Sequence, residues 1–205
     1  MAIVTIGLFA FNRQGIEGAM IMMLSHGLVS GALFLCVGVI YDRLHTREIS
    51  RYGGLAINMP RYALFFLFFT MASIGLPGTS GFVAEFLSLM GTYQVSTWIA
   101  LLCTTSIILG AAYMLYLYRR IAFGEIKSDE VRAMEDLSHR ELWLLAPIAA
   151  VALWMGVYPE SFMAPMRKDV AVLLTRVDRA APPSDSKPTA GKPAATTPAA
   201  AHAAA

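Results

Sequence analysis

The sequence has few charged residues. Asp, Glu, Lys and Arg make up only 15% of the 205 residues, whereas 57% are hydrophobic. An average soluble domain has about 25% charged residues. The formal net charge is only +2 and the basic residues are scattered, which argues against a nucleic-acid partner. We therefore expect a polytopic membrane protein with the lipid bilayer as its surroundings.

Cysteine is also scarce. Cys36 and Cys103 are single cysteines within apolar runs, where a free cysteine is usually a small buried hydrophobe. The two have neither disulfide nor metal-ligand spacing. The sequence also has no zinc, haem, iron–sulfur, phosphate-loop or dinucleotide-binding motif. We expect no metal site and no cofactor-binding site on this chain.

The first eleven residues lack the basic leader and the small-residue cleavage site of a signal peptide. They are apolar from Met1 onward but too short to span a bilayer. We interpret residues 1–11 as the end of a truncated transmembrane helix. On this interpretation the 205 residues are the C-terminal part of a longer protein.

Long apolar runs predict the transmembrane helices. They cover residues 16–41, 62–93, 97–118 and 141–158. The loop at 42–60 and the linker at 119–140 are short and rich in arginine, and the parity of the spans puts both on one side. The positive-inside rule assigns that side to the cytoplasm. In a bacterial inner membrane the C-terminus would then be periplasmic.

The run at 62–93 is too long for one straight helix. It would measure about 45 Å, against a hydrocarbon core of about 30 Å. Pro77 removes an amide donor, and Gly78 and Gly81 permit the backbone angles of an unwound segment. We therefore predict two half-helices with a break at 77–81. Such a break persists at membrane depth only where protein buries it or where it lines a hydrated cavity.

Glu85 follows the predicted break. The positive end of the second half-helix dipole favours a carboxylate there. A capping role alone is the less favoured interpretation, because serine or threonine would cap the helix without placing a charge at this depth. Glu85 is thus a candidate residue for holding an ion.

His26 lies near the middle of the span at 16–41, where an ionisable side chain is costly and usually faces the bundle interior. An imidazole can gain or lose a proton at physiological pH, so a proton relay is chemically available. A neutral histidine satisfied by a neighbouring helix is the alternative, and both remain open. For Glu17, at the start of the same span, we favour a structural role as an anion at a helix start.

The C-terminal region changes character twice. Apolar residues interleaved with basic ones predict an amphipathic helix at 162–179, lying on the membrane surface or on a partner. The proline-, alanine- and threonine-rich segment 181–205 has no apolar face to bury, so we predict that it is disordered. The predicted fold class is all-α, a polytopic transmembrane helix bundle with one discontinuous helix.

Three runs near the start carry a family resemblance. Gly15–Ala19, Met23–Leu35 and Gly38–Arg43 resemble the C-terminal half of the M-subunit family of proton-translocating NADH-quinone oxidoreductase, respiratory complex I. Arg51–Leu55 and Gly75–Phe86 extend the resemblance, which covers about residues 1–120.

Some of these motifs occur more widely. The serine-histidine-glycine run and the broken helix are shared with the cation/proton antiporter subunits that the complex I membrane arm resembles. Glu85, where some relatives carry lysine, and the ending Tyr41-Asp42-Arg43 favour the M-subunit family.

The resemblance implies an antiporter-like half-repeat that acts as a proton-channel subunit without a redox site of its own. NADH, flavin, iron–sulfur clusters and quinone would be bound by partner subunits of the complex, and other membrane-arm subunits would be the neighbours of this chain. Their chemistry would drive proton translocation through this chain. The resemblance implies that Glu85 is the ionisable group of the outward half-channel and that His26 belongs to the polar axis that feeds it.

Two alternatives remain open. One is a cation/proton antiporter subunit with sodium-dependent transport. The other is a truncated, non-pumping scaffold. The family carries an N-terminal repeat with a membrane glutamate and buried lysines, whereas this chain has no lysine before Lys127. We therefore expect that the isolated chain lacks the input half-channel and cannot pump alone.

Overall fold

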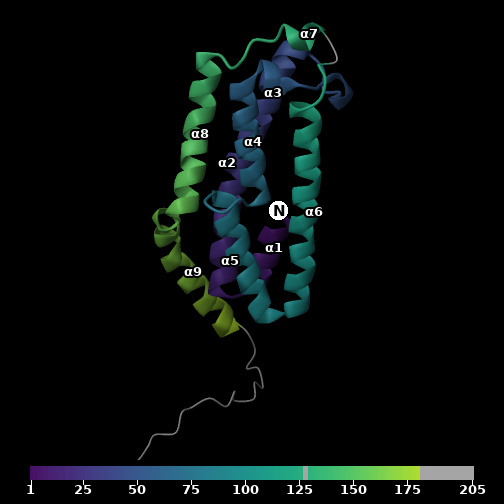
Figure 1. The fold of residues 1–205 in the computed structure, drawn as a ribbon. Helices are drawn as coiled ribbons and strands as arrows, with labels where there is room; N and C mark the ends of the chain where they lie inside the picture. The colour runs from purple at the N-terminus through teal and green to yellow at the C-terminus, as the bar shows by residue number, and fades with distance from the viewer. Residues whose placement is uncertain (127–128, 181–205) are drawn as a thin grey trace, which may run out of the picture.

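The computed structural model describes residues 1–126 and 129–180, and the secondary structure in these two ranges is entirely helical (Figure 1). The elements are α1 (Ala2–Phe9), α2 (Arg13–Leu44), the 3-10 turn η1 (Ile49–Arg51), α3 (Leu55–Asn58), α4 (Pro60–Ile74), α5 (Ser80–Val95), α6 (Thr97–Ala122), α7 (Asp129–Arg132), α8 (His139–Val157) and α9 (Glu160–Ala180). The predicted all-α bundle is confirmed. The segment 181–205, predicted to be disordered, lies outside the described residues.

Three helices, α2, α6 and α8, are long and apolar enough to cross a membrane, and α4 is a shorter apolar helix. About 20 apolar residues suffice to span a bilayer. Many large apolar side chains of α6 are exposed, among them Trp98, Leu102 and Leu109. Exposed apolar faces of this extent suit contact with lipid or with another membrane protein. The chain is a multi-pass membrane protein.

The long apolar run folds as two half-helices. α4 ends at Ile74 and α5 begins at Ser80, so residues 75–79 form the break. Gly75 and Gly78 have φ angles of +88° and +92°. Side chains disfavour this region of backbone conformation, whereas glycine adopts it readily. The predicted discontinuous helix is confirmed.

The break begins and ends two residues earlier than the predicted range 77–81. Pro77 and Gly78 lie within it, but Gly81 belongs to the first turn of α5. Gly81 serves a different purpose, because a β-carbon there would collide with the carbonyl oxygen of Ala72 in α4. Its missing side chain lets the two half-helices approach each other closely.

Several helices extend beyond the apolar runs that predicted them. α2 begins three residues before the predicted start of its span, and the side chain of Asn12 caps it by accepting a hydrogen bond from the amide of Gly15 at 2.7 Å. α6 continues to Ala122, four residues into the predicted linker 119–140. An apolar run marks the depth of the membrane, whereas backbone hydrogen bonds continue the helix into the polar region.

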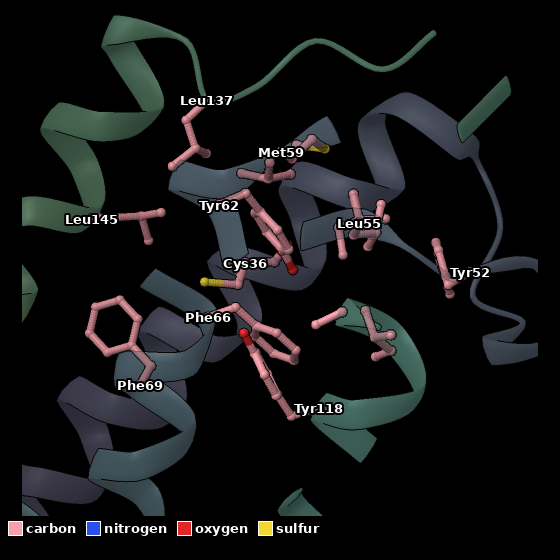
Figure 2. Packing of buried hydrophobic residues seen from close by; sticks show 14 of the residues in the cluster. Cys36, Tyr52, Leu55, Met59, Tyr62, Phe66, Phe69, Tyr118, Leu137 and Leu145 are labelled. Atoms are coloured by element: carbon pink, nitrogen blue, oxygen red, sulfur yellow. The ribbon is translucent and has the colours of Figure 1, made fainter. Parts of the chain in front are cut away.

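The main hydrophobic core joins α2, α4 and α6 (Figure 2). Tyr62 donates its hydroxyl to the carbonyl of Cys36 at 3.2 Å, and Tyr118 donates to the carbonyl of Ala63 at 3.3 Å. The rings of Phe66 and Tyr118 lie 5.6 Å apart. Each buried hydroxyl has a hydrogen-bond partner. Both tyrosines therefore connect helices without the free-energy cost of burying an unpaired hydroxyl.

The loop after α2 and the linker before α8 lie at the same end of the bundle, the upper end in Figure 1. Arg43 of α2 donates to both carboxylate oxygens of Glu141 in α8, at 3.1 and 2.9 Å. Asp136 of the linker accepts hydrogen bonds from the amides of Arg61 and Tyr62, at the start of α4. The linker thereby ties the ends of α2, α4 and α8 together.

At the opposite end, α9 continues from α8 after a bend and packs against α2, in the region where the amphipathic helix was predicted (Figure 1). Glu17 is 6% exposed and pairs with Arg13 at 2.7 Å, and its carboxylate lies 4.0 Å from Arg167 of α9. Arg167 also donates to Glu160 at 2.7 Å. Since Asn12 provides the cap of α2, Glu17 acts in an ion-pair network between α2 and α9.

Candidate functional site

A cavity of about 330 Å³ lies beside the helix break, between α1, α2, α4, α5 and α6. Its lining is mostly apolar but contains several side chains that can exchange or bind protons. These are Ser25, His26, Ser30, Ser73, Glu85, Ser106 and Tyr113. The two predicted proton-transfer residues, Glu85 and His26, thus line one cavity from two different helices.

Glu85 lies in the second turn of α5 and is 9% exposed. Its carboxylate rests against the backbone of Gly75, where a β-carbon would collide with Glu85 Oε2. Within residues 1–126 and 129–180, no group forms a hydrogen bond or a salt bridge with this carboxylate. A largely buried carboxyl group without a fixed partner is suited to taking up and releasing a proton.

His26 lines the same cavity but is exposed in this chain. Its imidazole has no hydrogen-bond partner in the described part of the chain, while its backbone carbonyl accepts a bond from Ser30 at 2.5 Å. The satisfied-histidine alternative would need a partner on a neighbouring helix, which these residues do not supply. Both ring nitrogens remain available to water or to a group outside the described residues.

Two serines form a polar contact beside the cavity that was not predicted from the sequence. The hydroxyls of Ser25 and Ser80 lie 2.7 Å apart and are buried. Ser80 is the first residue of α5, so this contact fastens the end of the break to α2. Its sequence signal was slight: Ser25 directly precedes His26, and Ser80 directly precedes Gly81.

α8 holds the break from another side. A β-carbon at Gly156 of α8 would collide with the carbonyl oxygen of Gly78 and with the backbone of Thr79. The missing side chain at position 156 therefore lets α8 lie against the unwound segment. A single glycine in an apolar run did not reveal this contact, because nothing local to position 156 specifies its neighbour.

The described residues hold no group of three or more His, Cys, Asp or Glu side chains that could bind a metal ion. Cys36 and Cys103 are free and buried. The chemistry that the cavity offers is therefore that of one carboxyl group, one imidazole and several hydroxyls beside an irregular backbone segment. These groups can bind water and pass protons.

A family model described as NADH:quinone oxidoreductase/Mrp antiporter, TM, matches residues 1–110. NADH-quinone oxidoreductase subunit M of Rhodobacter capsulatus is 60% identical over 159 residues, which cover 78% of this chain and 31% of that protein. NADH-ubiquinone oxidoreductase chain 4 of Chondrus crispus is 51% identical over 163 residues, which cover 80% and 33%. The chain spans about a third of the length of these relatives.

Two solved structures resemble the fold. Respiratory complex I from Thermus thermophilus with bound NADH matches with a TM-score of 0.74 and 36% identity, over 84% of this chain and 37% of the matched chain. The Mrp complex from Dietzia sp. DQ12-45-1b matches with a TM-score of 0.70 and 22% identity, over 86% and 41%, a likeness of fold alone. Since the family model covers more than half of the sequence and the fold agrees, the chain belongs to the NADH:quinone oxidoreductase/Mrp antiporter transmembrane family.

Proposed function

We propose that this chain forms part of a membrane-arm subunit of respiratory NADH:quinone oxidoreductase and carries protons across the membrane. The observation that carries the proposal is the cavity beside the helix break, which Glu85 and His26 line together. The identity of 60% to a subunit M supports the same assignment. NADH, flavin, iron–sulfur clusters and quinone would be bound by other subunits of the complex.

In this proposal Glu85 is the group that holds the proton. When its surroundings are dry, burial favours the neutral carboxylic acid, because no described residue hydrogen-bonds to the carboxylate or forms a salt bridge with it. Water in the cavity or an approaching cation favours the carboxylate, and the proton leaves. The unwound segment 75–79 is consistent with such water, because an irregular segment persists at membrane depth only where protein buries it or where it lines a hydrated cavity.

His26 would deliver protons to the cavity from the polar interior of the complete subunit. Its imidazole can accept a proton on one nitrogen and release one from the other at physiological pH. The role is supported by its position on the cavity wall and by the absence of a hydrogen-bond partner within the described residues. Other membrane-arm subunits and lipid would surround the exposed helix faces.

The proposed location is a bacterial inner membrane with the C-terminus in the periplasm. The basis is the positive-inside rule, since Arg43, Arg47, Arg51 and Arg61 all belong to one end of the bundle, at the loop between α2 and α4. The end at which α9 lies would then face the periplasm.

The test is NADH-driven acidification by membranes that contain the full-length subunit with Glu85→Gln. The proposal expects pumping to fall strongly, because the amide cannot release a proton. Glu48→Gln, which removes an exposed carboxylate from the loop after α2, serves as the matched control. Normal pumping together with a normal quinone reductase rate in Glu85→Gln would refute the assignment.

A second variant, His26→Ala, tests the relay separately. If His26 passes protons, the variant assembles but pumps more slowly, and added imidazole buffer restores part of the rate. If His26→Ala assembles and pumps at the normal rate, the residue has only a packing role. Measuring assembly on a native gel separates loss of proton transfer from loss of the complex.

A cation/proton antiporter subunit is the second candidate, and the likeness of fold to the Mrp complex favours keeping it. An antiporter would exchange sodium for protons without NADH. Sodium-dependent proton movement that persists when NADH oxidation is inhibited would support it. A non-pumping scaffold would instead leave transport unchanged in both Glu85→Gln and His26→Ala while the complex still assembles.

A further inference from the structure

One helical turn beyond the cavity, α1, α2 and α5 close tightly together. The cavity-lining residues nearest this closure are Ile3 of α1, Met22 of α2 and Glu85 of α5. Three or four residues further along these helices lie Gly7, Gly18 and Ser88. The next layer contains Gly15 and Gly91. We call these five residues, Gly7, Gly15, Gly18, Ser88 and Gly91, the glycine plug.

The backbones in the plug are in contact because four of its five positions lack a side chain. A β-carbon at Gly18 would lie 2.5 Å from the amide nitrogen of Ser88 and 2.7 Å from its hydroxyl oxygen. One at Gly7 would lie 2.7 Å from the carbonyl oxygen of Gly15, and one at Gly91 would collide with the backbone of Gly15. The plug therefore leaves no space for a water molecule between these backbones.

Ser88 is the one residue of the glycine plug that has a side chain. Its side chain is 1% exposed, and its hydroxyl oxygen has no hydrogen-bond partner in the described part of the chain. A buried hydroxyl without a partner is destabilising, since it has lost its bonds to water and gained none in return. Glycine or alanine would close the same layer without that cost.

Polar groups continue beyond the plug. Asn12 donates its side-chain amide to the carbonyl of Gly91 at 2.6 Å, and Gln94 donates to Gln14 at 2.6 Å on the exposed surface. A proton that passed Ser88 would therefore meet groups that bind water.

We propose that the glycine plug is a gate, closed in this structure, between the Glu85 cavity and the end of the bundle at which Asn12 lies. When α5 moves away from α1 and α2, water enters and hydrogen-bonds to Ser88 Oγ, which connects Glu85 to that surface. The inference rests on the proposed function, because it gives the proton of Glu85 its exit.

The direct test uses Ser88→Cys in the full-length subunit, within right-side-out membrane vesicles loaded with NADH. A membrane-impermeant methanethiosulfonate reagent is added outside, and labelling is compared with vesicles loaded with NAD⁺. Modification about tenfold faster during turnover is expected, if the open state is a minor one at rest. Proton pumping by the same variant establishes that it assembles.

Thr70→Cys is the matched control, because Thr70 Oγ1 is also buried without a partner in the described part of the chain but lies in α4, outside the glycine plug. It should stay unlabelled in both conditions, as should the buried Cys36 and Cys103 of the unmodified chain. Equal labelling of Ser88→Cys with NADH and with NAD⁺, or no labelling in either, would overturn the gate.

Gly18→Ala and Ser88→Ala provide a second measurement, because the two variants are expected to change different quantities. The added methyl group must push α5 away, so passive proton leak through resting vesicles should rise several-fold. Ser88→Ala should leave the leak unchanged and lower pumping per NADH. An unchanged leak in assembled Gly18→Ala contradicts the gate.

These results separate the gate from the function on which it rests. Loss of pumping in Glu85→Gln with turnover-independent labelling of Ser88→Cys refutes the gate alone. Normal pumping in Glu85→Gln refutes the proposed function itself.

Discussion

The backbone of Gly75 lies directly against the carboxylate of Glu85, with no space for a side chain between them. The two residues belong to different parts of the broken helix, the start of the break and the second turn of α5. The position of the ionisable group thus depends on the shape of the break itself. A change at Gly75 should displace Glu85 without altering its chemistry.

Gly75→Ala is therefore expected to slow NADH-driven proton pumping by roughly tenfold to a hundredfold, the effect of a misplacement of about 1 Å. Gly78→Ala is the matched control. Gly78 also has a positive φ, so alanine strains the backbone there, but a β-carbon at that position meets open space. Equal losses of pumping in the two variants would mean that strain, and not contact with Glu85, is responsible.

The hydrogen bond between the hydroxyls of Ser25 and Ser80 should contribute to the stability of the subunit. Either single change to alanine leaves one buried hydroxyl without its partner and should cost about 1–2 kcal/mol. The double variant removes both hydroxyls and should be close to the unmodified protein. Rates of thermal inactivation of the assembled complex provide the comparison. Additive losses in the double variant would show that the two hydroxyls do not depend on each other.

The ion pair of Arg43 and Glu141, which we call the clamp, should hold α2 and α8 together at the end of the bundle where the linker 119–140 lies. Both side chains are largely buried, at 19% and 14% exposure, and two hydrogen bonds join them. Arg43→Ala is expected to destabilise the subunit by about 2 kcal/mol, because it leaves a partly buried carboxylate unpaired. A lowered temperature of thermal inactivation measures the effect.

Arg47→Ala is the control for the clamp. Arg47 is exposed and lies over the ring of Tyr41, 5.0 Å from its centroid. Surface changes of this kind usually alter stability by about 0.5 kcal/mol or less. The clamp has no special importance if the two arginine variants inactivate at the same temperature.

The ion pairs of Arg167 should help to hold α9 against α2. Arg167 binds Glu160 and approaches Glu17 of α2, but it is 38% exposed, so solvent weakens its contribution to about 1 kcal/mol or less. Arg167→Ala should leave the fold intact and make α9 more accessible to protease. Faster tryptic cleavage at Lys168 in membranes is the expected observation, and Arg176→Ala is the control because Arg176 is exposed. Unchanged cleavage at Lys168 would show that apolar packing alone holds α9.

Much of the fold could be predicted because the membrane makes the sequence simple to interpret. Long apolar runs mark helices, and a run that exceeds the bilayer and contains Pro77 and Gly78 must break. Glu85 and His26 stood out for the same reason, since ionisable groups are rare within apolar runs. What failed was the extent of the break. Gly75, with its positive φ, ends α4 before Pro77 is reached.

The remaining contacts depend on which helices become neighbours, and no local pattern specifies this. Ser25 and Ser80 are 55 residues apart, and Arg43 and Glu141 are 98 apart. Gly156 is a single glycine in an apolar run, and its sequence does not indicate that it lies against the backbone of the break. Such residues can be recognised only when the packing of the bundle is known.

Proton transfer by Glu85 requires that this residue changes its protonation state during turnover. Infrared difference spectroscopy of the assembled complex, oxidised against NADH-reduced, tests it most directly, because a protonated carboxyl group has its own carbonyl stretching band. We expect this band to change in the unmodified complex and in Glu48→Gln, and the change to be lost in Glu85→Gln. A difference spectrum of Glu85→Gln that still contains the full carboxyl band would show that Glu85 is not the group that gains and loses the proton.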